Sequence, residues 1–238
     1  GGREEEPMNL AMIYMASGFA SRFGENKLLF PFRGKPLYCH GLEHLQEAAG
    51  LLADGEGKRP FLAVVSQYRE ILEAAGEQGL CAVPNHESRE GITASLKLGT
   101  RAAGERDAYL YFVADQPFMR AETICAFVRG FAESGKGIGC VTCGKVRGNP
   151  VIFSGKYREN LLALRGDRGG RQIMEAFPED IWFMETETRE LFDIDRREDL
   201  EPQADGCMGD TNCMACRDAA KIEPAERRGG CAYGKAEK

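Results

Sequence analysis

Two basic residues, Arg22 and Lys27, lie in a glycine-containing segment that directly follows the apolar run 9–14. An apolar run that ends in small residues is typical of a buried strand feeding a ligand-binding loop at the carboxyl edge of a sheet. Small side chains would let a triphosphate approach the main-chain N–H groups; they are Ala16, Ser17, Gly18, Ala20 and Ser21. Arg22 and Lys27 would add fixed positive charge, so the segment predicts a nucleotide site.

The glycine spacing separates this loop from two common phosphate-binding motifs. Five residues lie between Gly18 and Gly24, and Lys27 comes three residues after Gly24. A P-loop requires G-x4-G-K-[ST], and a dinucleotide fold requires G-x-G-x-x-G after the first strand. Neither pattern is present at this position, so both folds are disfavoured.

Acidic residues at the ends of two further apolar runs predict a metal site. Asp115 follows the run 109–113 and could hold Mg²⁺ between the α- and β-phosphates, although a solvated turn aspartate would fit the same pattern. Asp193 and Asp195 flank Ile194 at strand spacing, so both carboxylates would project from one face. Either one could be a second metal ligand. Asp195 equally suits the N-cap of a helix over 196–200.

Several ordered motifs resemble those of the MobA-like nucleotidyltransferases, and in particular the molybdenum cofactor cytidylyltransferases. The resemblance covers roughly residues 8–201. It rests on one loop signature, small-small-Gly-x-x-Ser-Arg-x-Gly-x-x-Lys followed by Gly34-Lys-Pro-Leu37, and on five later motifs: Glu90-Gly-Ile-Thr-Ala-Ser-Leu96, Asp115-Gln-Pro117, Gly148-Asn-Pro150, Leu164-Arg-Gly-Asp-Arg-Gly169 and the closing segment Asp193–Leu200. Six ordered motifs make coincidence improbable.

The resemblance implies roles for further residues. Gly91 and Ser95 would contact the nucleotide, together with Ala16, Ser17, Gly18, Ser21, Arg22 and Lys27 from the loop. The acceptor would bind around Arg147, Gly148, Asn149 and Pro150, where Lys145 and Arg147 favour an anionic ligand. Asp167 precedes a helix expected near Arg168, whose free N–H groups could hold a phosphate; structural capping by Asp167 is the competing interpretation.

The function implied is Mg²⁺-dependent transfer of CMP from CTP to the terminal phosphate of molybdopterin, with release of pyrophosphate. Arg22, Lys27 and Asp115 would be catalytic, and no general base is needed because the nucleophile is already an anionic phosphate. Ser17 departs from the alanine of the cytidylyl branch and the glycine of the guanylyl branch, so GTP stays open. Cytidylyl or uridylyl transfer to a different phosphorylated acceptor also stays open, as does a non-catalytic maturation factor for a molybdoenzyme.

Alternating apolar runs predict one three-layer α/β/α domain over residues 8–202, with a mostly parallel, Rossmann-like sheet. The resemblance implies the same nucleotide-diphospho-sugar transferase-like fold. The expected helices are 37–49, 68–78, 92–103, 122–133, 156–164 and 168–177, and the expected strands are 9–14, 61–66, 80–84, 108–113, 137–143, 151–153, 182–185 and 190–193.

Composition narrows the class of protein. The 238 residues are 43% hydrophobic, enough for one substantial core, and the net charge of −6 disfavours nucleic-acid binding. The apolar segment 8–16 is too short to span a bilayer and follows acidic residues, so neither a membrane segment nor a signal peptide is expected. We therefore expect a cytoplasmic protein.

A cysteine-rich tail, 203–238, follows the expected domain. Cys207, Cys213, Cys216 and Cys231 lie within a segment that has few core-forming residues. Four thiolates could fold such a segment around zinc or an iron–sulfur cluster. A disordered or redox-active tail fits the same composition. In either case, the tail could dock on a molybdoenzyme or on its maturation chaperone.

Overall fold

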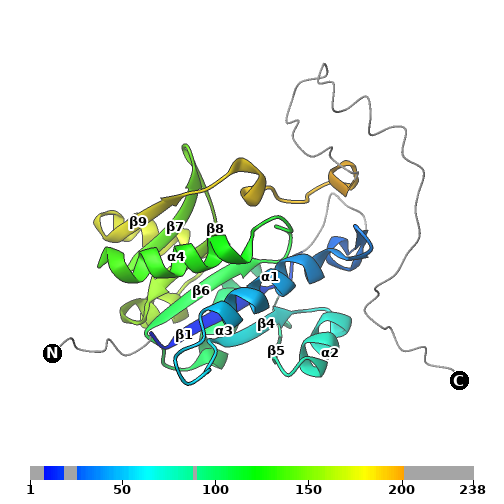
Figure 1. Cartoon of the computed structure of the whole chain (residues 1–238), viewed down its shortest axis with the longest axis horizontal. Coiled ribbons are helices and arrows are strands. Elements are labelled where there is room, and N and C mark those ends of the chain that lie inside the picture. Colours follow the sequence, from blue (N-terminus) through cyan, green and yellow to red (C-terminus); the bar gives the residue numbers. More distant parts are fainter. Residues whose placement is uncertain (1–7, 19–25, 88–89, 201–238) are drawn as a thin grey trace, which may run out of the picture.

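Seven strands form the central sheet of the computed structural model, which describes residues 8–18, 26–87 and 90–200 (Figure 1). Their order across the sheet is β5-β4-β1-β6-β8-β7-β9. In chain order the strands are β1 (Leu10–Met15), β4 (Phe61–Ser66), β5 (Cys81–Pro84), β6 (Ala108–Val113), β7 (Ile138–Cys143), β8 (Val146–Ser154) and β9 (Ile181–Glu185). Two further strands of two residues each, β2 (Pro31–Phe32) and β3 (Lys35–Pro36), form a separate hairpin.

The sheet is mostly parallel, as the alternation of strands and helices predicts. Strand β1 pairs in parallel with β4 and β6, β4 with β5, and β7 with β9. Only β8 runs against its neighbours β6 and β7. The register places Met15 of β1 beside Val113 of β6, so both chains leave the sheet at the same carboxyl edge.

Alternate residues of β1 enter two separate hydrophobic layers. Met12 and Tyr14 pack into one layer, whereas Ala11 and Ile13 pack into the other. This period of two is what a strand buried on both faces requires. The helices that cover these faces are α1 (Leu37–Leu51), α2 (Arg69–Glu77) and α4 (Ala121–Ser134) on the first side, and α3 (Ile92–Ala103), α5 (Arg158–Leu162) and α6 (Arg171–Ala176) on the second.

Close helix packing positions the start of α3 above the sheet. A Cβ atom at Gly99 would collide with the side chain of Ile13, so glycine lets α3 approach β1. On the opposite face, α1 and α4 lie side by side (Figure 1). Among the described residues, no helix is both long and apolar enough to cross a membrane.

The structure corrects four expectations in the second half of the chain. Residues 190–193 do not form a strand, because the carboxylate of Glu190 turns into the protein and Thr188–Leu191 forms a 3-10 turn around it. Gly148-Asn-Pro150 is not a loop before a short strand but part of β8, where Gly148 lies opposite Val141. The last two expected helices are shorter, namely α5 and α6.

Candidate functional site

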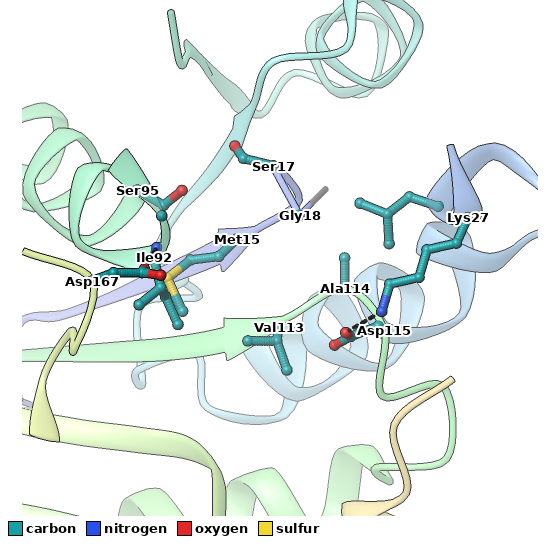
Figure 2. A pocket seen from close by; sticks show the side chains of 12 residues that line it. Met15, Ser17, Gly18, Lys27, Ile92, Ser95, Val113, Ala114, Asp115 and Asp167 are labelled. Atoms are coloured by element: carbon teal, nitrogen blue, oxygen red, sulfur yellow. Dashed lines mark hydrogen bonds and ion pairs between the residues drawn. The ribbon is translucent and has the colours of Figure 1, made fainter. Parts of the chain in front are cut away.

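A pocket of about 360 Å³ opens at the carboxyl ends of β1 and β6 (Figure 2). Its lining comes from segments that are far apart in the sequence. These are Met15, Ser17 and Gly18 after β1, Lys27 and Leu28, the start of α3 from Gly91 to Ser95, Val113–Asp115 after β6, and Asp167. The structure therefore brings together most of the described residues that the sequence assigned to nucleotide binding; Ala16 is buried just behind Ser17.

Lys27 lies at the centre of a charged cluster in this pocket. A 3-10 turn, Lys27–Leu29, presents the lysine, and the side chain of Asn26 caps that turn by accepting from the Leu28 N–H at 3.1 Å. The Lys27 Nζ donates to Asp115 Oδ2 at 2.8 Å and to Asp195 Oδ1 at 3.1 Å (Figure 2 draws the first pair). The lysine side chain is only 8% exposed.

The two carboxylates keep Lys27 charged. Burial alone would lower the pKa of the Lys27 ammonium, but Asp115, followed by Asp195, raises that pKa above its ordinary value. An ammonium whose pKa is raised stays protonated near neutral pH and can hold a phosphate oxygen. Lys27 is therefore a cation at the edge of the pocket near neutral pH.

The negative charge of Asp193, next to this cluster, is destabilised by its surroundings. The pKa of Asp193 is raised to about 6, first by burial and then by the charge of Asp115. Ile194 is buried between the two acids, as expected, and its N–H donates to the Asp115 carbonyl at 2.9 Å. Asp195 Oδ1 accepts from Lys27, and Asp199 Oδ2 accepts from the Asp195 and Arg196 N–H groups.

A divalent metal would offset the repulsion between these carboxylates. In the described part of the chain, no three His, Cys, Asp or Glu side chains form a ready-made metal group. Mg²⁺, however, is usually held by only one or two carboxylates, with substrate phosphates and water completing its shell. Asp115 and Asp195 already converge on one cation, the Lys27 ammonium. Their hard oxygen donors fit Mg²⁺.

The opposite wall of the pocket is the start of α3, which is fixed by Asp167. The carboxylate Oδ1 of Asp167 accepts from the Ile92 N–H at 3.2 Å, and a Cβ atom at Gly91 would collide with this carboxylate. Gly91 also has a φ of +74°, which glycine tolerates best. Ser95 is buried one turn further along and accepts from the Asn85 side chain at 3.1 Å.

Asp167 thus caps a different helix from the one expected. The expectation was a helix starting near Arg168, but α6 begins at Arg171 and has no side-chain cap. The loop before α6 instead packs against the start of α3, where the Gly169 N–H donates to Thr93 Oγ1 at 3.1 Å. The packing of this loop brings Asp167 to the Ile92 N–H, one of the helix N-terminal donors that have no partner within the helix itself.

A second pocket, of about 370 Å³, lies beside the first and shares Met15, Ile92 and Asp167 with it. The residues predicted to bind the acceptor that line it are Arg147, Gly148, Asn149 and Asp167. Pro150 is buried and is not part of this lining. The two pockets therefore share a wall, as transfer between two bound substrates requires.

Sequence reasoning missed several residues of these pockets. Arg168, Arg171 and Cys140 line the second pocket, and only Arg168 lay within a recognised motif. Burial raises the pKa of the Cys140 thiol to about 11, so it stays protonated. Gln67 and Tyr68 hold the loop after β1 by donating to the carbonyls of Ser17 and Gly18 at 2.8 and 3.0 Å.

Some predicted residues lie outside the described residues. They are Ser21 and Arg22 of the loop and the four tail cysteines, Cys207, Cys213, Cys216 and Cys231.

Residues 12–181 match the model of the MobA-like NTP transferase domain. The chain belongs to the MobA-like NTP transferase family. It is an enzyme, a nucleotidyltransferase, and its mostly parallel three-layer fold is that of the nucleotide-diphospho-sugar transferases.

Three further proteins resemble it over most of its length. A probable molybdenum cofactor guanylyltransferase of Pyrococcus horikoshii is 28% identical over 204 residues, which cover 81% of this chain and 98% of the relative. Rv0371c from Mycobacterium tuberculosis aligns with a TM-score of 0.68 at 19% identity over 81% of this chain and 95% of that chain, and it has also been solved in complex with manganese. A nucleotidyl transferase from Methanothermobacter aligns with a TM-score of 0.63 at 22% identity, covering 81% and 94% of the two chains.

Proposed function

We propose that this nucleotidyltransferase moves CMP from CTP to the terminal phosphate of molybdopterin and releases pyrophosphate. The observation that supports the proposal most directly is that the two pockets lie side by side and share lining residues. One pocket holds Lys27 and Asp115 beside the loop after β1, and the other is lined by arginines and by the predicted acceptor residues. Molybdopterin as the acceptor is supported by the motif resemblance and by the name of the Pyrococcus relative.

In the proposed reaction, a phosphate oxygen of the acceptor attacks the α-phosphorus of the nucleotide. The new O–P bond forms as the bond to the β-phosphate breaks, and the electron pair leaves with pyrophosphate. Lys27 would stabilise the charge that grows on the leaving group, and the wall formed by Ile92 and Asp167 would align the two substrates. The acceptor oxygen is already anionic, so the chain need not supply a general base.

Asp115 and Asp195 would hold Mg²⁺, with Asp193 as an additional oxygen donor. When bound, Mg²⁺ would neutralise the phosphates and stabilise the departing pyrophosphate. Rv0371c, a protein of similar fold, has been solved in complex with manganese, which supports the proposal of a metal here. In this chain, the release of Lys27 from Asp115 and Asp195 would free its ammonium for the phosphates.

CTP is the favoured nucleotide because Asp115-Gln-Pro117 resembles the cytidylyl branch. GTP is the second candidate, because the curated relative is named a guanylyltransferase. Ser17 lines the nucleotide pocket and is neither the alanine of one branch nor the glycine of the other. Replacing Ser17 with glycine should open space for a larger base and narrow the preference for CTP.

A pyrophosphate-release assay with CTP, GTP, ATP and UTP, each with and without molybdopterin, tests the proposal. We expect release only with acceptor and Mg²⁺, fastest with CTP. Faster release with GTP would assign the protein to the guanylyl branch, and the proposed transfer reaction would still hold. No release with molybdopterin for any nucleotide would refute the acceptor.

A further inference from the structure

A third pocket, of about 400 Å³, lies between α1 and the start of α4 and shares no lining residue with the two pockets already described. The segment after β6 separates this pocket from the proposed nucleotide pocket. Asp115 lines the proposed nucleotide pocket, whereas Pro117 and Phe118 line the third pocket. The proposed transfer reaction gives this pocket no role.

Two arginines from distant segments converge on one ring in this pocket. The Arg33 guanidinium carbon lies 5.2 Å from the centre of the Phe118 ring, and that of Arg189 lies 5.0 Å from it. Arg33 comes from the β2–β3 hairpin, and Arg189 comes from the 3-10 turn Thr188–Leu191. Contact with the ring restrains both side chains, so less conformational entropy is lost when they bind an anion.

The unusual backbone conformation of Arg33 suggests a binding role for its side chain. Arg33 has a φ of +46° and is the only residue other than glycine with a positive φ in the described part of the chain. A two-residue hairpin turn of this kind favours Asn or Gly at that position. An arginine held in the left-handed region is strained, and such strain is common at binding sites.

The charges around the pocket leave positive potential for a ligand. Two carboxylates, Glu187 and Glu190, line it, but both are hydrogen-bonded by Arg120. Arg33 has no acidic partner among the described residues. His44 adds an unsatisfied ring nitrogen, since its buried Nδ1 has no hydrogen-bond partner there.

We propose that the pocket formed by Arg33, Phe118 and Arg189 binds the phosphate group of a small phosphorylated molecule, separately from nucleotide and acceptor. A single carboxylate is satisfied by one guanidinium fork, whereas a phosphate has enough oxygens and charge to accept from two. The volume exceeds that of a phosphate, so the organic part of an ester also fits.

The test is an NMR titration of the ¹⁵N-labelled full chain with inorganic phosphate and with glycerol phosphate, at constant ionic strength and without nucleotide. We expect saturable shifts of the Arg33, Phe118 and Arg189 amides. The double variant Arg33→Gln/Arg189→Gln should bind at least ~10-fold more weakly at this pocket, because each charged hydrogen bond contributes a large share of the affinity. Arg69→Gln is the matched control, since Arg69 pairs with Glu73 on the distant helix α2.

Acetate, a single carboxylate, at the same ionic strength is the arm that separates phosphate from carboxylate recognition, and it should bind more weakly. Equal or tighter acetate binding, the absence of saturable shifts at these three amides, or the same loss in Arg69→Gln would each overturn the proposal. Pyrophosphate release by the double variant should stay unchanged. A failure of this site is therefore distinguishable from a failure of the proposed transfer reaction.

Discussion

Two charged clusters lie near the carboxyl edge of the central sheet, and they differ in how completely their charges are satisfied. In the Lys27 cluster, one ammonium serves two carboxylates, and a third acid, Asp193, has a pKa raised to about 6 by burial and by Asp115. In the Glu190 cluster, one carboxylate that is 3% exposed receives hydrogen bonds from three residues, Arg120, Thr123 and Thr186.

The pKa of Asp193 and the pKa of Glu190 shift in opposite directions for this reason. Burial alone would raise the pKa of Glu190, but hydrogen bonds from Thr186, Thr123 and Arg120 lower it below its usual value. Glu190 is thus fully compensated and fixes the segment before the acidic pair onto α4. The Lys27 cluster has more negative than positive charge, and Lys27 and Asp115 line the first pocket, which is typical of a functional site.

The largest expected effect is the loss of turnover when the Lys27 cluster is broken. Lys27→Ala and Asp115→Asn should each lower the rate of pyrophosphate release by at least ~100-fold, the usual scale for losing a preorganised charge aimed at reacting phosphates. Their circular dichroism spectra should match the native spectrum. Lys58→Ala, at an exposed loop position, is the control. Near-native rates in either variant would remove that residue from the mechanism.

Breaking the Glu190 cluster should instead cost stability. Glu190→Ala leaves the Arg120 N–H and two hydroxyl groups without their acceptor, so we expect a loss of about 2 to 3 kcal/mol in the free energy of unfolding measured with urea. Glu190→Gln keeps some acceptors and should lose less. Glu187→Gln is the control, because this exposed carboxylate contacts the same arginine. Equal losses in Glu190→Ala and Glu187→Gln would contradict the comparison.

The third prediction uses the raised pKa of Asp193. A carboxyl group whose pKa is higher in the folded protein binds more protons when folded, so its contribution to stability falls as pH rises from about 4 to about 6. Asp193→Asn should therefore stabilise the metal-free protein at pH 7.5 but much less at pH 4. The gain should stay below about 1 kcal/mol, since the side chain still reaches solvent. A gain at pH 4 equal to that at pH 7.5 would show that charge is not the cause.

The smallest expected effect concerns the tail, which the sequence assigns to a separate role. A chain ending at Pro202 should release pyrophosphate at close to the full-length rate, because all the family-like motifs end by Leu200. Metal analysis of the full-length protein, purified without oxygen, tests whether the four cysteines hold zinc or iron. Loss of most activity on truncation would show that the tail completes the catalytic site.

Local sequence patterns were sufficient for the first half of the fold. The apolar runs of β1, β4 and β6 are continuous because both faces of these strands are buried, and the loop after β1 contains the small residues that a phosphate site needs. Helices α1 and α3 carry apolar residues at helical spacing, so their positions were predictable.

Long-range contacts decided the rest. Glu190 lies in a segment whose pattern suggested a strand, but its carboxylate bonds to Arg120 and Thr123, about 70 positions earlier in the chain. Asp167 caps a helix that begins 75 positions before it. No local pattern encodes such partners, because they lie in segments that only the packed fold brings together.

The sequence by itself therefore determined the family, the alternation of strands and helices, and the residue types of a phosphate-handling site. Only the tertiary structure decided that Lys27 meets Asp115 and Asp195, which are separated from it by 88 and 168 positions. It also decided that the two pockets proposed for nucleotide and acceptor share a wall at Ile92 and Asp167. The physical reason is that residue types follow from local chemistry, whereas distances between charges follow from how the sheet and its covering helices pack.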